Sequence, residues 1–392
     1  MKERVILHCD LNNFFASVSL LYQPTLYGVP VAVSGSIENR HGIILAKNEL
    51  AKACGIKTAE AVWEAKTKCP QLVLIKAMYR EYQQFSKAAQ EIYSRYTDII
   101  EPFGIDECWL DVSGSTLLFG SGEQIAECIR REIKAELGIT VSVGVSFNKV
   151  FAKLGSDMKK PDAVTAITRE NFKQKVWPLS TDSLLFIGKS TAKKLKSLGI
   201  LTIGEISLCS DEVLSRLLGK AGPHLRRCAL GEENSPVVTP TAQDKPKSVG
   251  RSVTSAADFT NYEQVWQTFL TLSEDISATL HRHALYAGGV QIHTRTDKLT
   301  VKEFSHMIEY PTNSALILAR KGYELFCKNC RFAEPLRSVG LRAVHLKGEV
   351  IAVQQDLFGE CKEERRLESI EDSLYTLRGR FGKKSIVRGR TI

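Results

Sequence analysis

Three acidic residues at the rims of two expected strands constrain the fold of this chain more than any other feature. The apolar run at residues 5–9 predicts a short buried strand, and Asp10 follows it directly. A second strand is expected to begin at the adjacent pair Asp106 and Glu107. If the two strands are neighbours in one sheet, three carboxylates converge, and such crowded negative charge needs a cation. Paired Mg²⁺ ions held by such oxygen ligands can clamp a phosphoryl displacement.

A simpler interpretation of the same residues stays open at this point. An Asp after a strand is commonly a turn or helix-capping residue, because its side chain accepts hydrogen bonds from nearby backbone donors. An adjacent Asp–Glu pair is commonly part of a solvated surface. Spacing alone therefore yields only the hypothesis of a two-metal site for nucleotidyl transfer.

Length and composition limit the class of protein. The chain has 392 residues, 43% of them hydrophobic and 25% charged, which predicts a globular protein of about two to four domains. It contains neither an apolar run of about 18 residues nor a signal-peptide pattern. Its ten cysteines are scattered, as in reduced cytosolic proteins. We therefore expect a cytoplasmic protein without a membrane span.

The cysteines themselves predict no metal site. Cys9, Cys69 and Cys128 lie in apolar contexts, as expected of reduced thiols. The single CxxC, formed by Cys327 and Cys330, has no second pair nearby, so a helix end is favoured over a zinc site.

The net charge of +9 is compatible with nucleic acid, although many enzymes with anionic substrates share such a charge. Residues 376–392 carry six basic residues and no acidic one. This segment is interpreted either as a solvated tail or as an arm that contacts phosphates, and we favour the arm.

The first part of the chain alternates expected strands and helices. Helical apolar spacing and β-type runs predict strands at 5–9, 29–33 and 140–146 and helices at 13–21, 82–96 and 123–137, with Gly138 as a C-terminal cap. Such strand–helix–strand connections predict an α+β sandwich with helices on one face of a sheet.

Residues 181–230 have a different character, with short expected helices joined by glycines. Gly188 and Lys189 open one unit, and Gly219 and Gly222 lie in another. Glycine lets the backbone approach a phosphate, and helix N-termini supply N–H donors. This pattern predicts helix-hairpin-helix elements that grip a DNA backbone without reading bases. An ordinary small helical bundle with glycine caps remains an alternative.

Prolines mark residues 235–247 as an exposed linker, followed by a second α+β unit at 245–347. Its expected order is a helix at 262–283, strands at 290–295 and 299–304, a helix at 314–326 and a strand at 338–346. Gln291, His293 and Arg295 share one face of the first strand. Such a face suits a nucleic-acid groove, but any half-exposed antiparallel strand has one.

Taken together, several segments resemble the Y-family of translesion DNA polymerases, most closely the bacterial DNA polymerase IV group. The resemblance covers residues 1–358 and rests on the order and spacing of DLNNFFA (10–16), IDECWLD (105–111), GVSFNKVFAK (144–153), SDMKKP (156–161), IGK (187–189) and KSVGR (247–251). It implies an α+β multidomain, right-hand polymerase with a ferredoxin-like palm (1–16 and 79–165), small fingers (17–78), a helix-hairpin-helix thumb (166–234), a linker (235–246), an α+β little finger (247–347) and a C-terminal segment (348–392).

The resemblance also implies the roles of the acidic residues. Asp10 and Asp106 would ligate two Mg²⁺ ions, and the Leu11 carbonyl would be a further ligand. Glu107 would complete the catalytic site. Phosphoryl transfer depends mainly on positioning and charge neutralisation, which carboxylates, Mg²⁺ and phosphate-binding cations supply.

Nucleotide and DNA contacts follow from the same resemblance. Phe15 matches the steric gate that clashes with a ribose 2′-hydroxyl, and Phe14 beside it is expected mainly in the core. Lys160 matches a lysine that binds the incoming triphosphate. The nucleotide-binding set is Phe14, Phe15, Lys52 and Lys160, and the DNA-binding set is Lys149, Lys153, Gly188, Lys189, Gly219, Gly222, Arg251 and Arg295.

The fingers depart from the family pattern. Many members carry Tyr-x-x-Arg there, both contacting the triphosphate, whereas this chain has Glu49 and Lys52. Lysine lacks the bidentate fork of arginine, and a carboxylate repels phosphate. The triphosphate contact is therefore either rebuilt, with Lys47 or Lys52, or weaker. Further departures are Ser19, Gly104 and Phe186.

Residues 354–358 (QQDLF) resemble the peptide that binds the bacterial sliding clamp. Gln354, Leu357 and Phe358 would supply one amide and two apolar anchors. The implied partners are primer–template DNA, deoxynucleoside triphosphates and the clamp (β subunit), with the chain as a monomer. Residues 365–377, beyond this peptide, are expected to be helical.

The leading hypothesis is template-directed, error-prone translesion DNA synthesis by two-metal nucleotidyl transfer. The alternative is a catalytically weak, clamp-tethered DNA-binding factor, motivated by Glu49. A nucleotidyl cyclase on a related palm ranks lower, because it needs neither the thumb nor residues 354–358.

Overall fold

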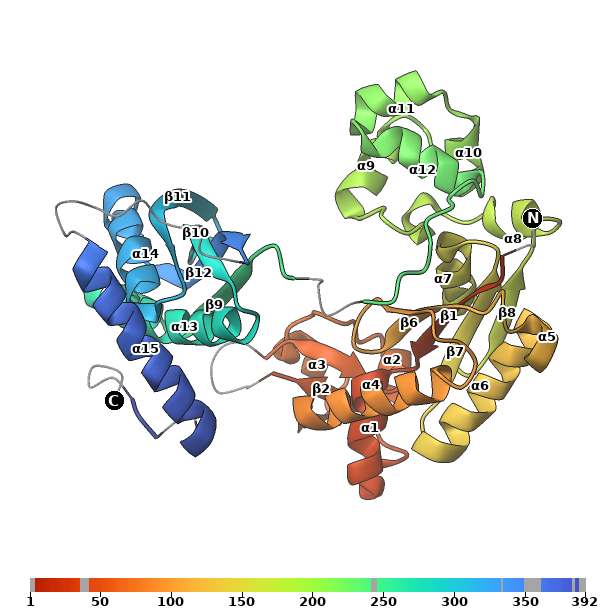
Figure 1. The fold of residues 1–392 in the computed structure, drawn as a ribbon. Coiled ribbons are helices and arrows are strands. Elements are labelled where there is room, and N and C mark those ends of the chain that lie inside the picture. The colour runs from red at the N-terminus through yellow and green to blue at the C-terminus, as the bar shows by residue number, and fades with distance from the viewer. Residues whose placement is uncertain are drawn as a thin grey trace. The chain divides into compact units, whose positions relative to one another are not determined.

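The computed structural model describes residues 4–35, 42–240, 245–332, 334–348, 361–382 and 385–387. The chain forms two compact units, Met1–Ile37 with Gly42–Thr241 and Glu38–His41 with Ala242–Ile392. Figure 1 shows the ribbon of each. Residues 354–358 lie outside the described residues. No helix in the described part of the chain is long and apolar enough to cross a membrane.

A five-stranded sheet brings the two acidic segments of the first unit together. Its order is β5 (Ile100–Pro102), β6 (Glu107–Asp111), β1 (Ile6–Leu11), β7 (Val141–Ser146) and β8 (Val164–Ile167). β1 pairs antiparallel with β6, and Asp10 lies opposite Glu107. The expectation that the two strands are neighbours is confirmed.

Helices cover both faces of this sheet, so the expectation of helices on one face was wrong. α1 (Phe14–Tyr22), α4 (Tyr79–Tyr93) and α6 (Gly122–Leu137) share a core with one face. On the other face, α7 (Lys149–Met158) contributes Ala152 to a cluster with Ile6 and Trp109. Gly144 permits this approach, because a Cβ there would lie 1.8 Å from the Ala152 carbonyl oxygen. Every residue of β1 and β7 is consequently buried.

A three-stranded sheet with order β3 (Ile44–Lys47), β2 (Val31–Ser34) and β4 (Val73–Lys76) forms the segment expected to be the fingers. The short helices α2 (Glu49–Ala53) and α3 (Val62–Lys68) accompany it. Asn48 joins β3 to α2, and its side chain accepts a hydrogen bond from the Ala51 N–H as an N-cap. The 3₁₀ turn η1 (Pro24–Leu26) precedes β2.

Short helices fill the region expected to be the thumb. They are α8 (Phe172–Val176), η2 (Thr181–Ser183), α9 (Lys189–Ser197), α10 (Ile203–Leu208), α11 (Asp211–Leu218) and α12 (Ala221–Ala229), while α5 (Thr116–Phe119) precedes α6. Gly188 is the exposed N-cap of α9, and Gly219 ends α11 with φ 65°. Gly222 is buried, and a Cβ there would lie 2.3 Å from the Leu214 carbonyl oxygen, so this glycine serves helix packing.

The second unit contains a four-stranded sheet of order β11 (Val301–Thr312), β10 (Tyr286–Thr296), β12 (Leu336–Lys347) and β9 (Val249–Phe259). Helices α13 (Tyr262–Arg282) and α14 (Ala315–Asn329) pack in its core. The expectation that a helix comes first was wrong, because β9 precedes α13. β9 is an edge strand in which only Val249 and Phe259, at its two ends, are buried, so it lacks a strand-like apolar pattern.

The cysteines of the described residues are free thiols in different surroundings. Cys9 and Cys69 are buried, whereas Cys128 is exposed. It lies on the solvent side of the amphipathic helix α6, whose apolar neighbours face the sheet. Cys330 is the C-cap of α14, which confirms that this CxxC marks a helix end.

Helix α15 (Cys361–Phe381) is longer than the expected 365–377. It packs against the rest of the second unit through charged contacts. The buried carboxylate of Glu371 accepts hydrogen bonds from the backbone N–H groups of Ala315 and Leu316 at the start of α14. His281 lies 3.0 Å from Asp372 and stacks on the Tyr375 ring. Glu371 thereby satisfies donors that a helix N-terminus leaves unpaired.

We predict that Glu371→Ala loosens the start of α14, because two buried N–H groups lose their acceptor. The free energy of opening should fall by about 1–2 kcal/mol, measured by hydrogen–deuterium exchange of the α14 amides in the full chain. Glu324→Ala is the control, since Glu324 is exposed and only pairs with Lys321 at 3.4 Å. Equal exchange in all three proteins would contradict the capping role.

Candidate active site

The three acidic residues line one cavity of about 360 Å³ in the first unit. Asp10 is 6% exposed near the end of β1. Asp106 directly precedes β6, and the N–H of Leu11 donates to its carbonyl oxygen at 3.0 Å. The cavity is lined by Asp10, Leu11, Asn13, Phe14, Phe15, Leu45, Ala46, Lys47, Thr58, Ile105, Asp106, Glu107 and Lys160. Antiparallel pairing has therefore brought sequence-distant carboxylates to one place.

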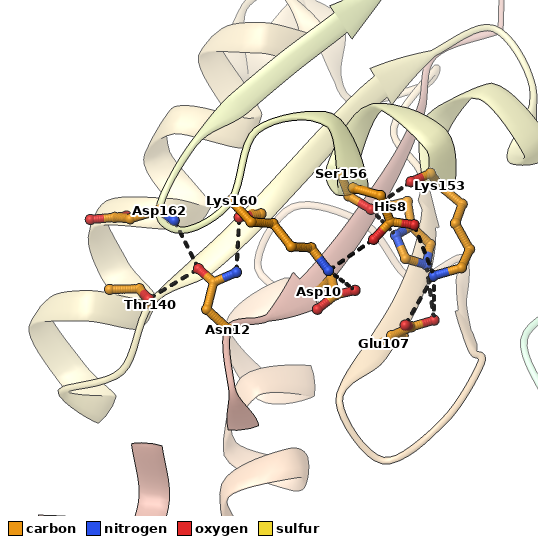
Figure 2. A network of polar contacts seen from close by, with 11 residues as sticks. His8, Asp10, Asn12, Glu107, Thr140, Lys153, Ser156, Lys160 and Asp162 are labelled. Carbon is orange, nitrogen blue, oxygen red and sulfur yellow. Dashed lines mark hydrogen bonds and ion pairs between the residues drawn. The ribbon is translucent and has the colours of Figure 1, made fainter. Parts of the chain in front are cut away.

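Two lysines neutralise the acids (Figure 2). Lys160 donates to Asp10 Oδ2 at 2.7 Å and lies 2.9 Å from Asp157 Oδ1. Lys153, on α7, donates to both carboxylate oxygens of Glu107 at 2.9 Å. Lys153 was predicted to contact DNA, but the structure places its ammonium in the acidic cluster.

The carboxylates differ in their protonation. Burial raises the pKa of Asp10 to about 7 despite the opposing charge of Lys160. Burial and the charge of Glu107 also raise the pKa of Asp106. Burial disfavours the charged form of Glu107 as well, but the nearby His8 ring and the hydrogen bonds from Lys153 outweigh it and lower its pKa to about 2. Negative charge at neutral pH is thus held firmly at Glu107 and weakly at Asp10.

Sequence reasoning missed His8, whose buried ring lies close to Glu107. Its Nδ1 is 2.8 Å from Ser156 Oγ, and its Nε2 is 3.6 Å from Glu107 Oε2. Burial lowers the pKa of His8, so the ring is neutral at pH 7. The available signal was spacing, because residues i and i+2 of a strand share a face, which puts His8 beside Asp10.

A second missed residue, Asn12, holds the segment that carries Lys160. Its Oδ1 accepts hydrogen bonds from Thr140 Oγ1 at 3.0 Å and from the Asp162 N–H at 2.8 Å. The Asp162 carboxylate in turn accepts from Arg130 at 2.7 Å. This network, part of which is visible in Figure 2, fixes the backbone next to Lys160.

The two phenylalanines have different surroundings. Phe14 is 2% exposed and packs in the core, although it also reaches the cavity. The half-buried Phe15 ring stacks on Tyr82 with centroids 4.1 Å apart and an interplanar angle of 9°. The stack holds a flat ring at the cavity wall, where a steric gate would have to lie. Its role as the gate stays a prediction.

The fingers side of the cavity contains Lys47 and Thr58, not Lys52. Lys52 is exposed and lies 3.5 Å from Glu49. Glu49 also accepts a hydrogen bond from Asn13 Nδ2 at 2.9 Å. Glu49, the residue that departs from the family pattern, is therefore bound by Asn13 and Lys52, and it does not line the cavity.

The other DNA-contact candidates lie in different surroundings. Lys149 donates to Glu101 at 2.6 Å and lies 4.5 Å from the Trp109 ring centroid, so its charge is already paired. Lys189 is exposed at the start of α9. In the second unit, Arg251 lines a groove of about 610 Å³ on the sheet, whereas the Nε atom of Arg295 is buried without a hydrogen-bond partner among the described residues. Their DNA contacts stay predictions.

The donor atoms at the cavity match the chemistry of a hard divalent cation, since carboxylates and a backbone carbonyl are the ligands such ions prefer. Within the described residues, no three His, Cys, Asp or Glu side chains are close enough together to hold an ion. Asp10 and Glu107 are instead engaged by Lys160 and Lys153. The oxygen donors fit a metal site in kind, and the ammonium groups supply the positive charge in this arrangement.

Comparison with known proteins identifies the family. Residues 9–157 match the impB/mucB/samB family, and residues 246–357 match its C-terminal domain. The DNA polymerase IV of Acetivibrio thermocellus is 49% identical over 387 residues, covering 99% of this chain and 97% of the relative. DNA polymerase IV 1 of Bacillus subtilis is 34% identical, covering 100% and 94%.

A solved structure agrees in fold. A chimeric Y-family DNA polymerase, 22% identical, superimposes with a TM-score of 0.78 and covers 87% of this chain and 98% of its own. Y-family polymerases are metal-dependent enzymes, in keeping with the donor atoms at the cavity. The chain therefore belongs to the Y-family of DNA-directed DNA polymerases, with the bacterial enzymes named DNA polymerase IV as relatives.

Proposed function

We propose that this chain copies DNA past damaged template bases, adding deoxynucleotides to a primer 3′ end with two Mg²⁺ ions. The observation that supports this most is the convergence of Asp10, Asp106 and Glu107 on one cavity beside Phe15 and Lys160. A phosphate-binding cation and a sugar-facing ring next to oxygen donors are what nucleotidyl transfer requires.

In this proposal Asp10 and Asp106 hold the ions, the Leu11 carbonyl adds a ligand, and Glu107 completes the site. The metal pair would supply charge neutralisation for the attacking and leaving oxygens. Lys160, whose ammonium is paired with Asp10 in this structure, would bind triphosphate oxygens once Asp10 has another counter-charge. Lys153 stays on Glu107 and limits repulsion among the acids.

Low fidelity is part of the proposal and rests on the family. Small fingers support it, since β2, β3 and β4 have 4 residues each. Small fingers over the nascent base pair can accommodate distorted templates. The alternative, a catalytically weak DNA-binding factor, was motivated by repulsion from Glu49. Because the Glu49 carboxylate is bound by Asn13 and Lys52 and is absent from the cavity lining, we prefer the polymerase.

The proposal includes the implied partners. Exposed Lys189 and Arg251 would contact primer–template phosphates. Gln354, Leu357 and Phe358 would bind the sliding clamp, raising the effective concentration of the enzyme at the primer end. We further propose that the enzyme acts as a monomer in the cytoplasm.

The metal assignment predicts that Asp106→Ala lowers primer extension by about a thousandfold or more, since a metal-binding carboxylate is lost. DNA affinity should change little, because Asp106 lies in the cavity. Single-nucleotide insertion with Mg²⁺ and a DNA-binding titration measure the two effects. Glu123→Ala, an exposed acid in the first turn of α6, is the control and should extend like the wild type. Extension by Asp106→Ala near the wild-type rate would rule out the assignment.

The steric-gate assignment predicts that Phe15→Ala admits ribonucleotides, because the ring that would meet a 2′-hydroxyl is gone. The ratio of kcat/KM for a deoxynucleotide to that for its ribonucleotide should fall about tenfold or more. Phe85→Leu is the matched control, since Phe85 packs against the same core but does not line the cavity, and it should keep the ratio. If sugar selection is unchanged in Phe15→Ala, the gate lies elsewhere.

The clamp assignment predicts that the double variant Leu357→Ala, Phe358→Ala loses clamp-stimulated synthesis and keeps basal synthesis. Both apolar anchors of the peptide are removed, while the described cavity is untouched. Primer extension with and without loaded clamp measures the difference, with Asp356→Ala as the control. A parallel loss of basal synthesis would show that the segment is structural.

A further inference from the structure

The cavity lining has parts that differ in charge. One part is acidic and is formed by Asp10, Asp106 and Glu107. Another part comes from Lys47, at the end of β3, and from Thr58 in the segment that follows. Lys47 is the last residue of β3 and lies opposite Ala32 of β2. A nucleoside triphosphate at the acids would bring further negative charge into the cavity, so a cationic group elsewhere in its lining becomes relevant.

Lys47 differs from the nearby lysines in its charge balance. Lys153, Lys160 and Lys52 each lie within ion-pair distance of a carboxylate. The Lys47 ammonium instead donates to the Thr58 hydroxyl at 3.1 Å, and no carboxylate of the described residues lies within 4.0 Å of it. Partial burial and the charge of Lys52 lower the pKa of Lys47. Among the described residues, Glu60 and Glu49 attract the Lys47 charge only from a longer distance, and each of them is paired with another lysine.

The backbone that carries Lys47 is firmly held. The neighbouring Asn48 side chain accepts from the Val31 N–H at 3.0 Å and from the Ala51 N–H at 2.9 Å. Its amide group donates to the Val29 carbonyl at 2.8 Å. A side chain mounted on such a fixed backbone loses less conformational entropy when it binds an anion.

Resting on the polymerase function proposed above, we propose that Lys47, steadied by the Thr58 hydroxyl, binds the phosphate chain of the incoming nucleoside triphosphate. Lys52 does not take this role, since Glu49 neutralises it outside the cavity lining. Lys47 acts as a point charge on non-bridging phosphate oxygens and contributes mainly to substrate binding. In this proposal the fingers contact the triphosphate through Lys47 at the end of β3, and not through Lys52 on α2.

The test is steady-state insertion of a single deoxynucleotide by the full chain on primer–template DNA. Lys47→Ala should raise the KM for the nucleotide about tenfold to a hundredfold, the effect of losing one charge-assisted contact. Its kcat should fall less than its KM rises, and its affinity for DNA should stay unchanged. Lys47→Arg, which keeps the charge, should stay within about threefold of the wild-type KM.

Lys66→Ala, which removes an exposed lysine of α3 outside the cavity lining, is the matched control, with an expected change in KM of less than about twofold. Lys52→Ala discriminates between the two lysines and should raise the KM less than Lys47→Ala does. The assignment to Lys47 would be overturned by a wild-type KM in Lys47→Ala. It would also be overturned if the KM of Lys52→Ala rose as much as that of Lys47→Ala, or more. Failure of the wild-type chain itself to insert any nucleotide would refute the proposed function instead. The two failures are therefore distinguishable. Thermal unfolding of each variant checks that a change in KM does not come from misfolding.

Discussion

The antiparallel pairing of β1 with β6 is the interaction on which the site depends. It sets Asp10 opposite Glu107, and the Leu11 N–H closes the ladder on the Asp106 carbonyl. A slip of one residue would turn Asp10 to the apolar face that packs against α4 and α6. β7 on the other side, with Ser142 opposite Asp10, resists such a slip. Every later feature of the cavity follows from this register.

Charge compensation is the second requirement. Carboxylates this close to one another are tolerated because α7 supplies Lys153 and the segment after it supplies Lys160. Close packing of α7 needs the bare backbone at Gly144. The same helix that fills the second face of the sheet therefore also balances the acids. Burial with one lysine leaves the pKa of Asp10 near 7, whereas Lys153 and His8 together hold that of Glu107 near 2.

The fingers show how a substitution that is unfavourable in isolation can be accommodated. Glu49 would repel phosphate if it faced the cavity, but its carboxylate is bound by Asn13 and Lys52 and is absent from the cavity lining. Asn48 fixes the end of β3 and the start of α2 together, which separates Lys47 from Glu49 although only Asn48 lies between them. Local backbone geometry thus decides which of these charges lines the cavity.

Local patterns in the sequence predicted much of the fold. The acids at strand rims, the apolar stripes of α4, α6 and α14, and Gly138 as the αL cap of α6 follow from short-range chemistry and spacing. β9 was not predictable in this way, since an exposed edge strand has no apolar alternation, and its existence depends on pairing with β12. The same applies to α7, whose position on the second face depends on a close contact across the sheet.

By itself, the sequence determined which residues are candidates for the chemistry, because residue type and spacing along a strand or helix are local properties. Only the tertiary structure decided which charges are paired. Lys149 and Lys153 look alike in sequence, yet one is paired with Glu101 and the other with Glu107. Lys47 and Lys52 also look alike, yet only Lys47 lines the cavity. Ion pairs and cavity walls join residues far apart in the chain, and their free energy depends on burial and distance, which no local pattern contains.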